Sequence, residues 1–319
     1  MLKRMSIRKI LVSTLTLFAL FLIYLLPNNN DLKDVKQELE YVNYDVLTHN
    51  IFLLDSNNFI AKTSVVIKST SSIDIATELV EILIIDGKGE SNIPSGFKSI
   101  IPSDTKINKV SLKDGLYEID FSEDFLSINK LLEEKMLEAL VFSITSVDDI
   151  NKVKITIEGR ELKCLPNSKV SIPSILDRSF GINKEYDITS SKDVESVTIY
   201  YINKYNDNYY YVPVTKYLNT TMSKIEVIIE QLKNPSITTD LMSFISDNVE
   251  LISSDINDKT INLVFNDYIF SNFDEKEILE EVIYTISLSI GENYDVEDVI
   301  FTVNDEEIAK SVIKSIETD

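Results

Sequence analysis

One alternating stretch, residues 109–126, limits most strongly how this chain can fold. Apolar and polar residues alternate on both sides of Asp114-Gly115, and this pair favours a two-residue turn because both central positions of a type I′ turn need positive φ. A turn there fixes the register of two antiparallel strands. The expected cross-strand pairs are Leu112 with Tyr117, Val110 with Ile119, and Lys109 with Asp120. The stretch therefore predicts a β-hairpin with one buried, apolar face.

The order of elements around this hairpin occurs twice in the chain. In each half, two short strands and an amphipathic helix precede a hairpin, which is followed by a second helix and a closing strand. The later hairpin turns at Asp258-Lys259, and Ser223 with Glu226 has the spacing of a capping box. The expected helices are 73–85 and 131–147 in the first half, and one after Ser223 and one at 278–290 in the second.

This repetition predicts an α+β protein with two tandem domains of the layout β-β-α-β-β-α-β. Each domain is expected to have a mostly antiparallel sheet with two helices on one face. A short terminal helix is expected at 308–316. The expected boundaries are 1–30 for a cytoplasmic tip and membrane anchor, 31–47 for a spacer, 48–162 for the first domain, 163–193 for a linker, and 194–319 for the second, more divergent domain.

The N-terminal segment predicts a membrane anchor. Residues 10–26 carry no charge, and four basic residues precede them. A cleaved signal peptide is the alternative, but the apolar run exceeds the roughly 7–15 residues usual for one, and no A-x-A site follows. The basic flank is expected to stay in the cytoplasm. The sequence therefore predicts a single-pass protein of the cell membrane with a cytoplasmic N-terminus and an extracytoplasmic body.

Charge and cysteine content exclude several classes of function. The chain of 319 residues has a net charge of −21, so its acidic surface would be repelled by the phosphates of nucleic acids. His49 and Cys164 are the single histidine and cysteine, and they can supply neither an intrachain disulfide nor a structural zinc site. Neither residue has a partner in the sequence that would predict nucleophilic catalysis.

Two acidic stretches are candidate sites of chemistry. Asp120, Glu123 and Asp124 follow the first hairpin and are residue types that act as acid and base or bind calcium. A pairing of Asp120 with Lys109 at the exit of a strand is the simpler interpretation. Residues 206–208, Asn-Asp-Asn, resemble part of a calcium loop but lack its glycine and distal glutamate. The sequence therefore predicts no catalytic, cofactor-binding or metal-binding residue.

Tyrosines are concentrated in the hairpin that opens the second half. Because successive side chains of a strand point to opposite faces, some of these rings are expected to face outward. Tyrosine is common in interfaces, although its β-propensity alone also accounts for the cluster. The predicted interaction patch, for a protein or a glycan, is Tyr201, Tyr205, Tyr209 and Tyr211.

The first half resembles the GerMN domain family of sporulation and spore germination proteins. The residues that carry the resemblance are Pro102 and Thr105, then Val110 to Gly115, then Asp120-Phe121-Ser122 with Phe125, and finally Ile155, Ile157 and Glu158-Gly159. The second half matches in layout but less in residues, since Asp258-Lys259 lacks the glycine and Asn266 stands in the place of Ser122.

The resemblance implies an extracytoplasmic protein of spore-forming bacteria, with domains similar to the ring-building folds of the channel that joins mother cell and forespore. It supplies no catalytic residues. We therefore expect a non-enzymatic assembly module, without a cofactor, that docks envelope or channel-complex proteins. The alternatives are a module that binds peptidoglycan through the tyrosine-rich hairpin, and a hydrolase that uses the acidic residues near Asp120.

Overall fold

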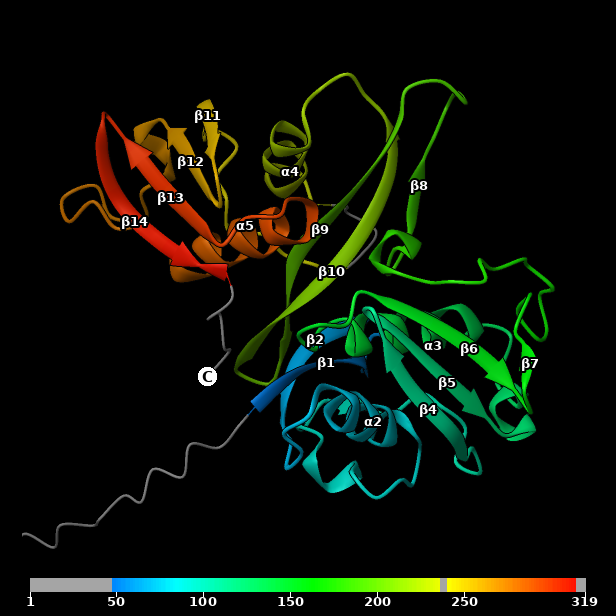
Figure 1. Cartoon of the computed structure of the whole chain (residues 1–319). Helices are drawn as coiled ribbons and strands as arrows, with labels where there is room; N and C mark the ends of the chain where they lie inside the picture. Colours follow the sequence, from blue (N-terminus) through cyan, green and yellow to red (C-terminus); the bar gives the residue numbers. More distant parts are fainter. Residues whose placement is uncertain (1–47, 236–239, 314–319) are drawn as a thin grey trace, which may run out of the picture. The chain divides into compact units, whose positions relative to one another are not determined.

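The computed structural model describes residues 48–235 and 240–313, and it confirms a mixed α+β fold. Four α-helices lie in this part of the chain: α2 (Ser72–Leu83), α3 (Glu133–Ile144), α4 (Lys224–Lys233) and α5 (Glu280–Asn293) (Figure 1). The side chain of Ser71 caps α2, and Ser223 forms the predicted capping box with Glu226. Each repeat contributes two of these helices in the predicted order.

The opening hairpins of the two repeats belong to one six-stranded sheet. Its order is β3-β1-β2-β10-β8, with β9 paired to β10. The repeats meet where Tyr211 of β10 pairs with Lys62 of β2. The strands are β1 (Thr48–Asp55), β2 (Ile60–Val66), β3 (Phe97–Lys98), β8 (Glu185–Asp187), β9 (Val194–Tyr205) and β10 (Asn208–Asn219). The prediction of one sheet per domain was therefore wrong, because each repeat divides its strands between two sheets.

The remaining strands form one four-stranded sheet in each repeat. The first contains β4 (Ile107–Lys113), β5 (Leu116–Phe121), β6 (Lys152–Ile157) and β7 (Arg160–Glu161), and the second contains β11 (Leu251–Asn257), β12 (Thr260–Phe265), β13 (Asp298–Val303) and β14 (Glu306–Val312). β5 pairs in parallel with β6, and β12 with β13. This follows from the connections, since a helix joins each pair and a helical crossover returns the chain in the same direction.

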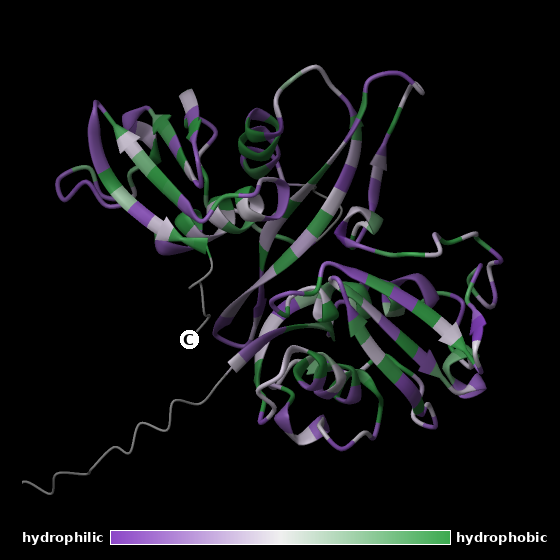
Figure 2. Cartoon of the chain, viewed as in Figure 1, coloured by the Kyte–Doolittle hydropathy of each residue, from purple (hydrophilic) through white to green (hydrophobic). Residues whose placement is uncertain are grey.

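The predicted register of the first hairpin is confirmed. Leu112 pairs with Tyr117, Val110 with Ile119, and Lys109 with Asp120. Asp114 and Gly115 have φ of 50° and 77°, as a type I′ turn requires. Buried and partly exposed residues alternate along β5, β12 and β13, which are banded green and purple in Figure 2.

The prediction of a helix at 308–316 is wrong in the part that the structure describes. Residues 306–312 form β14, which returns antiparallel to β13. Asn304 and Asp305 both have positive φ and make the tight turn between the strands. Two adjacent residues of this type are a hairpin signal, which outweighs the weak helical pattern that follows.

The predicted membrane protein also needs correction. No helix in the described ranges is long and apolar enough to cross a bilayer. The longest of them, α5, has 14 residues and so extends about 21 Å, against a hydrocarbon core of about 30 Å. The predicted anchor, residues 10–26, and the spacer, 31–47, lie outside the described residues.

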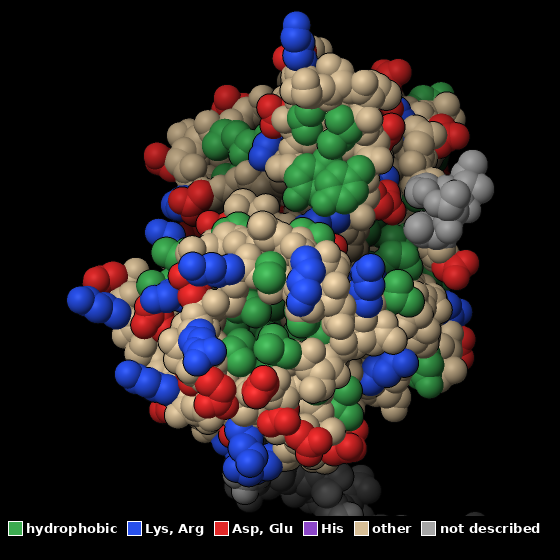
Figure 3. All heavy atoms as spheres, turned by 90° about the vertical axis from the view of Figure 1, so that its right-hand side faces the viewer, with side chains coloured by type: hydrophobic (Ala, Val, Ile, Leu, Met, Phe, Trp, Pro, Cys, Tyr) green, Lys and Arg blue, Asp and Glu red, His purple; other side chains and the backbone are tan. Residues whose placement is uncertain are grey.

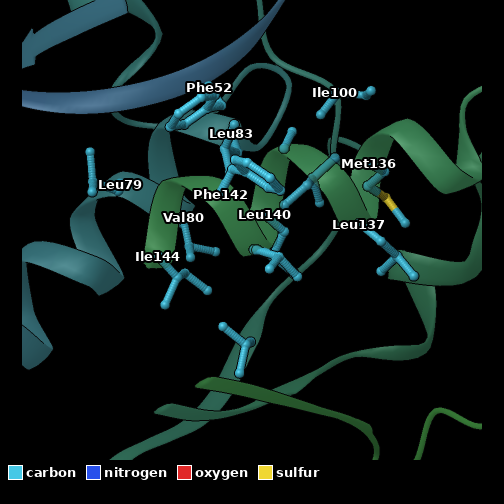
Figure 4. Close-up of a cluster of buried hydrophobic side chains, with 14 of the residues drawn as sticks. Phe52, Leu79, Val80, Leu83, Ile100, Met136, Leu137, Leu140, Phe142 and Ile144 are labelled. Atoms are coloured by element: carbon cyan, nitrogen blue, oxygen red, sulfur yellow. The ribbon is translucent and has the colours of Figure 1, made fainter. Parts of the chain in front are cut away.

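The core of the first repeat lies where α2 and α3 pack against β1 and β5. Leu79 and Leu83 of α2 and Leu140 of α3 belong to one cluster of fully buried side chains (Figure 4). The rings of Phe52 and Phe142 lie edge to face with centroids 5.4 Å apart. A second core, around β12, β13 and α5, fills the other repeat.

Gly115 and Gly159 offer a matched test of the first hairpin. Gly115→Ala is expected to lower the free energy of unfolding by about 2 kcal/mol, because the residue has positive φ and its Cβ would lie 2.8 Å from Asn151 Oδ1. Gly159 has a similar φ of 73°, but a Cβ added there would meet no atom within 4 Å. Gly159→Ala is therefore expected to lower the free energy of unfolding by only about 1 kcal/mol. Urea denaturation measures both; equal losses would show that the contact with Asn151 contributes nothing.

Candidate functional site

A groove of about 380 Å³ opens at the turn end of the β9–β10 hairpin, and we call it the tyrosine groove. Both repeats line it. The hairpin supplies one wall, and β2 with the segment that leads into β3 supplies the other. The lining includes Tyr205, Asn206, Asn208, Tyr209 and Tyr210 from the hairpin, and Ser64, Pro94 and Phe97 from the first repeat.

The buried carboxylate of Asp55 holds the two walls of the tyrosine groove together. Tyr210 donates its hydroxyl to Asp55 Oδ2 at 2.8 Å, and Asn203 donates its amide to the same oxygen at 3.2 Å. The other oxygen, Oδ1, accepts from two backbone N–H groups of the β1–β2 turn. Burial, and then the hydrogen bond and charge of Asp55, raise the pKa of Tyr210, so its hydroxyl stays protonated as a donor.

Two of the four predicted patch residues lie at the surface of the groove. Tyr209 is 44% exposed, with its ring edge to face with Phe244 and the ammonium of Lys204 5.6 Å from its centroid. Tyr205 is partly exposed and packs against Gly96, where an added Cβ would lie 2.6 Å from the tyrosine ring. The groove therefore presents two aromatic rings beside the side-chain amides of Asn206 and Asn208.

The other two predicted residues, Tyr201 and Tyr211, are buried. Tyr201 is 2% exposed and donates its hydroxyl to the backbone oxygen of Gln231 on α4. Tyr211 is 7% exposed and meets Tyr284 of α5 edge to face. Strand periodicity could not reveal this, because tertiary packing buries side chains on both faces of the β9–β10 hairpin, with α4 against Tyr201 and α5 against Tyr211.

A further pair of tyrosines, which the sequence did not single out, lies on β8 and β10. The rings of Tyr186 and Tyr217 stack with centroids 4.9 Å apart, and Tyr186 is 66% exposed. Figure 3 shows hydrophobic side chains gathered on the face that carries β8, with charges of both signs around them. The spacing of the two residues in the sequence gives no sign of the stack, because β8 and β10 are joined only through tertiary pairing.

Asp120 ties the first hairpin to the closing strand. Its Oδ1 accepts from Thr156 Oγ1 at 2.5 Å and from the N–H of Gly159 at 2.7 Å, and its Oδ2 accepts from Asn108. Burial raises the pKa of Asp120, but these hydrogen bonds and the charge of Lys109 outweigh it and lower the pKa below its ordinary value. The carboxylate is therefore held ionised and engaged, which does not suit a general acid.

The other candidate residues for chemistry are not brought together. Asp124 accepts from Ser122 Oγ, and Glu123 lines a separate surface pocket. Residues 206–208 make the turn of the tyrosine-rich hairpin, His49 lies in β1, and Cys164 is a free, half-buried thiol. Within the described residues, no three acidic, histidine or cysteine side chains are grouped so as to hold a metal ion.

The side-chain amide of Asn183 continues the shared sheet between the repeats. It donates to the backbone oxygens of Ile60 on β2 and Pro213 on β10, both at 2.7 Å, and its Oδ1 accepts from the N–H of Ile60 at 2.9 Å. Pro213 has no N–H to give to the ladder. The amide takes the place of that missing peptide group, and a proline inside an expected strand is the sequence signal for it.

A nearly buried ion pair also joins the repeats. Arg178 Nη1 donates to Glu292 Oε2 of α5 at 2.5 Å, and Tyr200 donates its hydroxyl to the same oxygen at 3.1 Å. Arg178 further donates to Thr145 Oγ1 and to the backbone oxygen of Phe142, at the end of α3. Residues expected to form a linker therefore supply contacts to both repeats.

Lys62 lies beside this ion pair and is 8% exposed. Burial, and then the charge of Arg178, lower its pKa to about 8, although the charge of Glu292 acts in the opposite direction. In the unfolded chain the pKa is 10.5, so the folded protein holds the proton less tightly. The charged form of Lys62 therefore destabilises the folded protein. This destabilisation is fully present below pH 8 and disappears as the pH rises through 10.5.

Lys62→Met is therefore expected to raise the free energy of unfolding by about 2 kcal/mol at neutral pH, because it removes a buried charge and keeps an unbranched apolar chain. The gain should shrink between pH 8 and 10.5. Denaturation in chloride buffer across this pH range measures it, with the exposed Lys68→Met as the matched control, expected within about 0.5 kcal/mol of the parent. A loss of stability in Lys62→Met at pH 7 would contradict the prediction.

Comparisons with known proteins agree over both repeats. A family model described as sporulation and spore germination (Germane) matches residues 50–163 and 198–309. The spore germination protein GerM of Bacillus subtilis (strain 168) is 35% identical over 264 residues, which cover 80% of this chain and 70% of the relative. The solved tandem GerMN domains of the sporulation protein GerM from Bacillus subtilis match with a TM-score of 0.74 at 32% identity, covering 81% of this chain and 91% of that chain.

Proposed function

The chain belongs to the sporulation and spore germination (Germane) family, and from this premise we propose that it acts as a non-enzymatic assembly module that docks other proteins of the sporulating cell. The resemblance to GerMN domains that the sequence suggested is confirmed. The relatives are named as sporulation and germination proteins, which supports a sporulation-related role. The partner that we propose is an envelope or channel-complex protein.

The observation that carries the proposal is the exposed edge of β11. This strand ends the sheet β11-β12-β13-β14, and its Ile252 and Ile256 are 63% and 46% exposed. An edge strand with outward apolar side chains can pair with a strand of another chain. The equivalent edge of the first repeat, β4, carries the exposed Lys109 and Lys113, which discourage such pairing.

The test compares Ile256→Lys with Val66→Lys in sporulating cells. Val66 is also an exposed strand residue, at 43%, but lies on β2, so its substitution is the matched control. We expect Ile256→Lys to lower spore yield and to lose the proteins that cross-link to the parent chain, while Val66→Lys keeps both. Normal spore yield and unchanged cross-linking in Ile256→Lys would refute docking at β11, and normal spore yield after deletion of the gene would refute the sporulation role.

The tyrosine groove favours a second function, the binding of cell-wall glycan. Exposed aromatic rings beside amide side chains suit sugar rings, which present apolar faces and hydroxyl edges. Sedimentation with purified peptidoglycan tests this. The parent chain should leave the supernatant and Tyr209→Ala should remain in it, whereas Tyr186→Ala, which alters an exposed tyrosine outside the groove, should sediment normally. If the parent chain is not depleted, the glycan function is excluded.

A further inference from the structure

We propose that the cavity between the two repeats binds a small anion, a carboxylate or a phosphate, at the ammonium of Lys62. The cavity has a volume of about 330 Å³, at the lower end of the range usual for ligand pockets. Residues of both repeats line it, among them Asn50, Lys62, Arg178 and Glu292. We call it the junction cavity.

Lys62 supplies a positive charge that forms no ion pair with any residue that the structure describes. Its side chain is 8% exposed, and no carboxylate among the described residues forms an ion pair with it. Phe52, its cross-strand neighbour on β1, also lines the cavity. A buried ammonium is unfavourable unless something pairs with it. An anion in the cavity would supply that partner.

The nearby charges do not fulfil this role. Glu292 directs its Oε2 to Arg178 and to the hydroxyl of Tyr200, and it forms no ion pair with Lys62. Arg178 in turn directs its Nε and Nη2 to Thr145 and to the backbone of Phe142. Asp148 lines the cavity but is exposed to solvent, where water screens its charge. Lys62 therefore remains the cation that is available for a ligand.

Neighbouring polar groups give an anion a further donor. Asn50 lines the cavity, and its amide oxygen accepts from Ser64, so its NH₂ group is the end that can donate to a ligand. The hydroxyl of Ser146 donates to backbone oxygens and is not available. One ammonium and one amide can bind two oxygens of the same carboxylate or phosphate, which suits a small, compact anion.

The test is a titration of the full chain with inorganic phosphate and, separately, with glutarate, at an ionic strength kept constant with chloride. Calorimetry and thermal unfolding are measured for the parent chain, Lys62→Met, Lys62→Arg and Lys135→Met. Lys135 is the matched control, because its half-buried ammonium donates to Asn58 outside the cavity. The charge-retaining Lys62→Arg keeps a cation at the site.

We expect saturable binding and a rise in the unfolding temperature for the parent chain, Lys62→Arg and Lys135→Met. Lys62→Met should bind at least tenfold more weakly. A response to phosphate alone, or to glutarate alone, would support the proposal and identify which anion the cavity takes. The proposal is overturned if neither probe gives binding heat or raises the unfolding temperature of the parent chain beyond the chloride control. It is also overturned if Lys62→Met binds like the parent chain.

Discussion

Asn183→Ala is expected to lower the free energy of unfolding by about 4 kcal/mol. The substitution removes the three hydrogen bonds to β2 and β10, which leaves the N–H and oxygen of Ile60 and the oxygen of Pro213 without their partner. It also removes a longer bond, of 3.5 Å, from Lys135 Nζ to Asn183 Oδ1. Each unsatisfied buried group costs about 1–3 kcal/mol. Asn183 also has a φ of 45°, a conformation that alanine adopts with strain. Urea denaturation followed by far-UV circular dichroism measures the loss.

Asn58→Ala is the matched control for this effect. Asn58 has a φ of 63° and is exposed in the β1–β2 turn, so its substitution reports the backbone strain alone. A loss of about 1 kcal/mol is expected there. If the two variants lost the same stability, the amide of Asn183 would contribute nothing to the joint between β2 and β10.

The second large effect is expected for Arg178→Met, at about 3 kcal/mol. The Glu292 side chain is 6% exposed, and the substitution leaves its carboxylate buried without the guanidinium that forms an ion pair with it. Breaking a buried pair costs about 3–5 kcal/mol, and the lower figure applies because the Arg178 side chain is 33% exposed and partly screened by water. Chemical denaturation at neutral pH measures the change.

The double variant Arg178→Met/Glu292→Met separates the charge from the packing. It removes both charges, so it should recover most of the stability that Arg178→Met loses. Lys276→Met, which breaks an exposed ion pair with Glu306, is the control and should change stability by less than about 0.5 kcal/mol. A double variant as unstable as Arg178→Met would mean that Arg178 acts through its contacts with Thr145 and Phe142.

Local features of the fold could be predicted from the sequence because their causes are local. The Asp114-Gly115 turn set the register of β4 and β5, and Ser223 with Glu226 set the start of α4. The order of elements in both repeats followed from periodicity. The α+β class followed from that order, since the apolar faces of the helices and of the sheets must be buried against one another.

The division of strands between sheets could not be predicted, because it depends on contacts between distant segments. β2 and β10 meet through Tyr211 and Lys62, and Asn183 completes the joint. The burial of Tyr201 and Tyr211 has the same origin, since only tertiary packing brings α4 to Tyr201 and α5 to Tyr211. The burial of Lys62 could likewise not be predicted, because a lysine in an alternating strand is expected to face water.

β4 and β11 are equivalent strands of the two repeats, but they differ in the residues that they expose at the edge of their sheets. Lysines at the edge strand β4 discourage pairing with another strand, whereas the exposed isoleucines of the edge strand β11 do not. A molecule that pairs with a partner strand at one sheet edge but not at the other can bind at the end of a chain of such partners, but no further molecule can add to it. Under the docking that we propose, the duplication would thus give the molecule a polarity, with one repeat that attaches to a partner strand and one that does not.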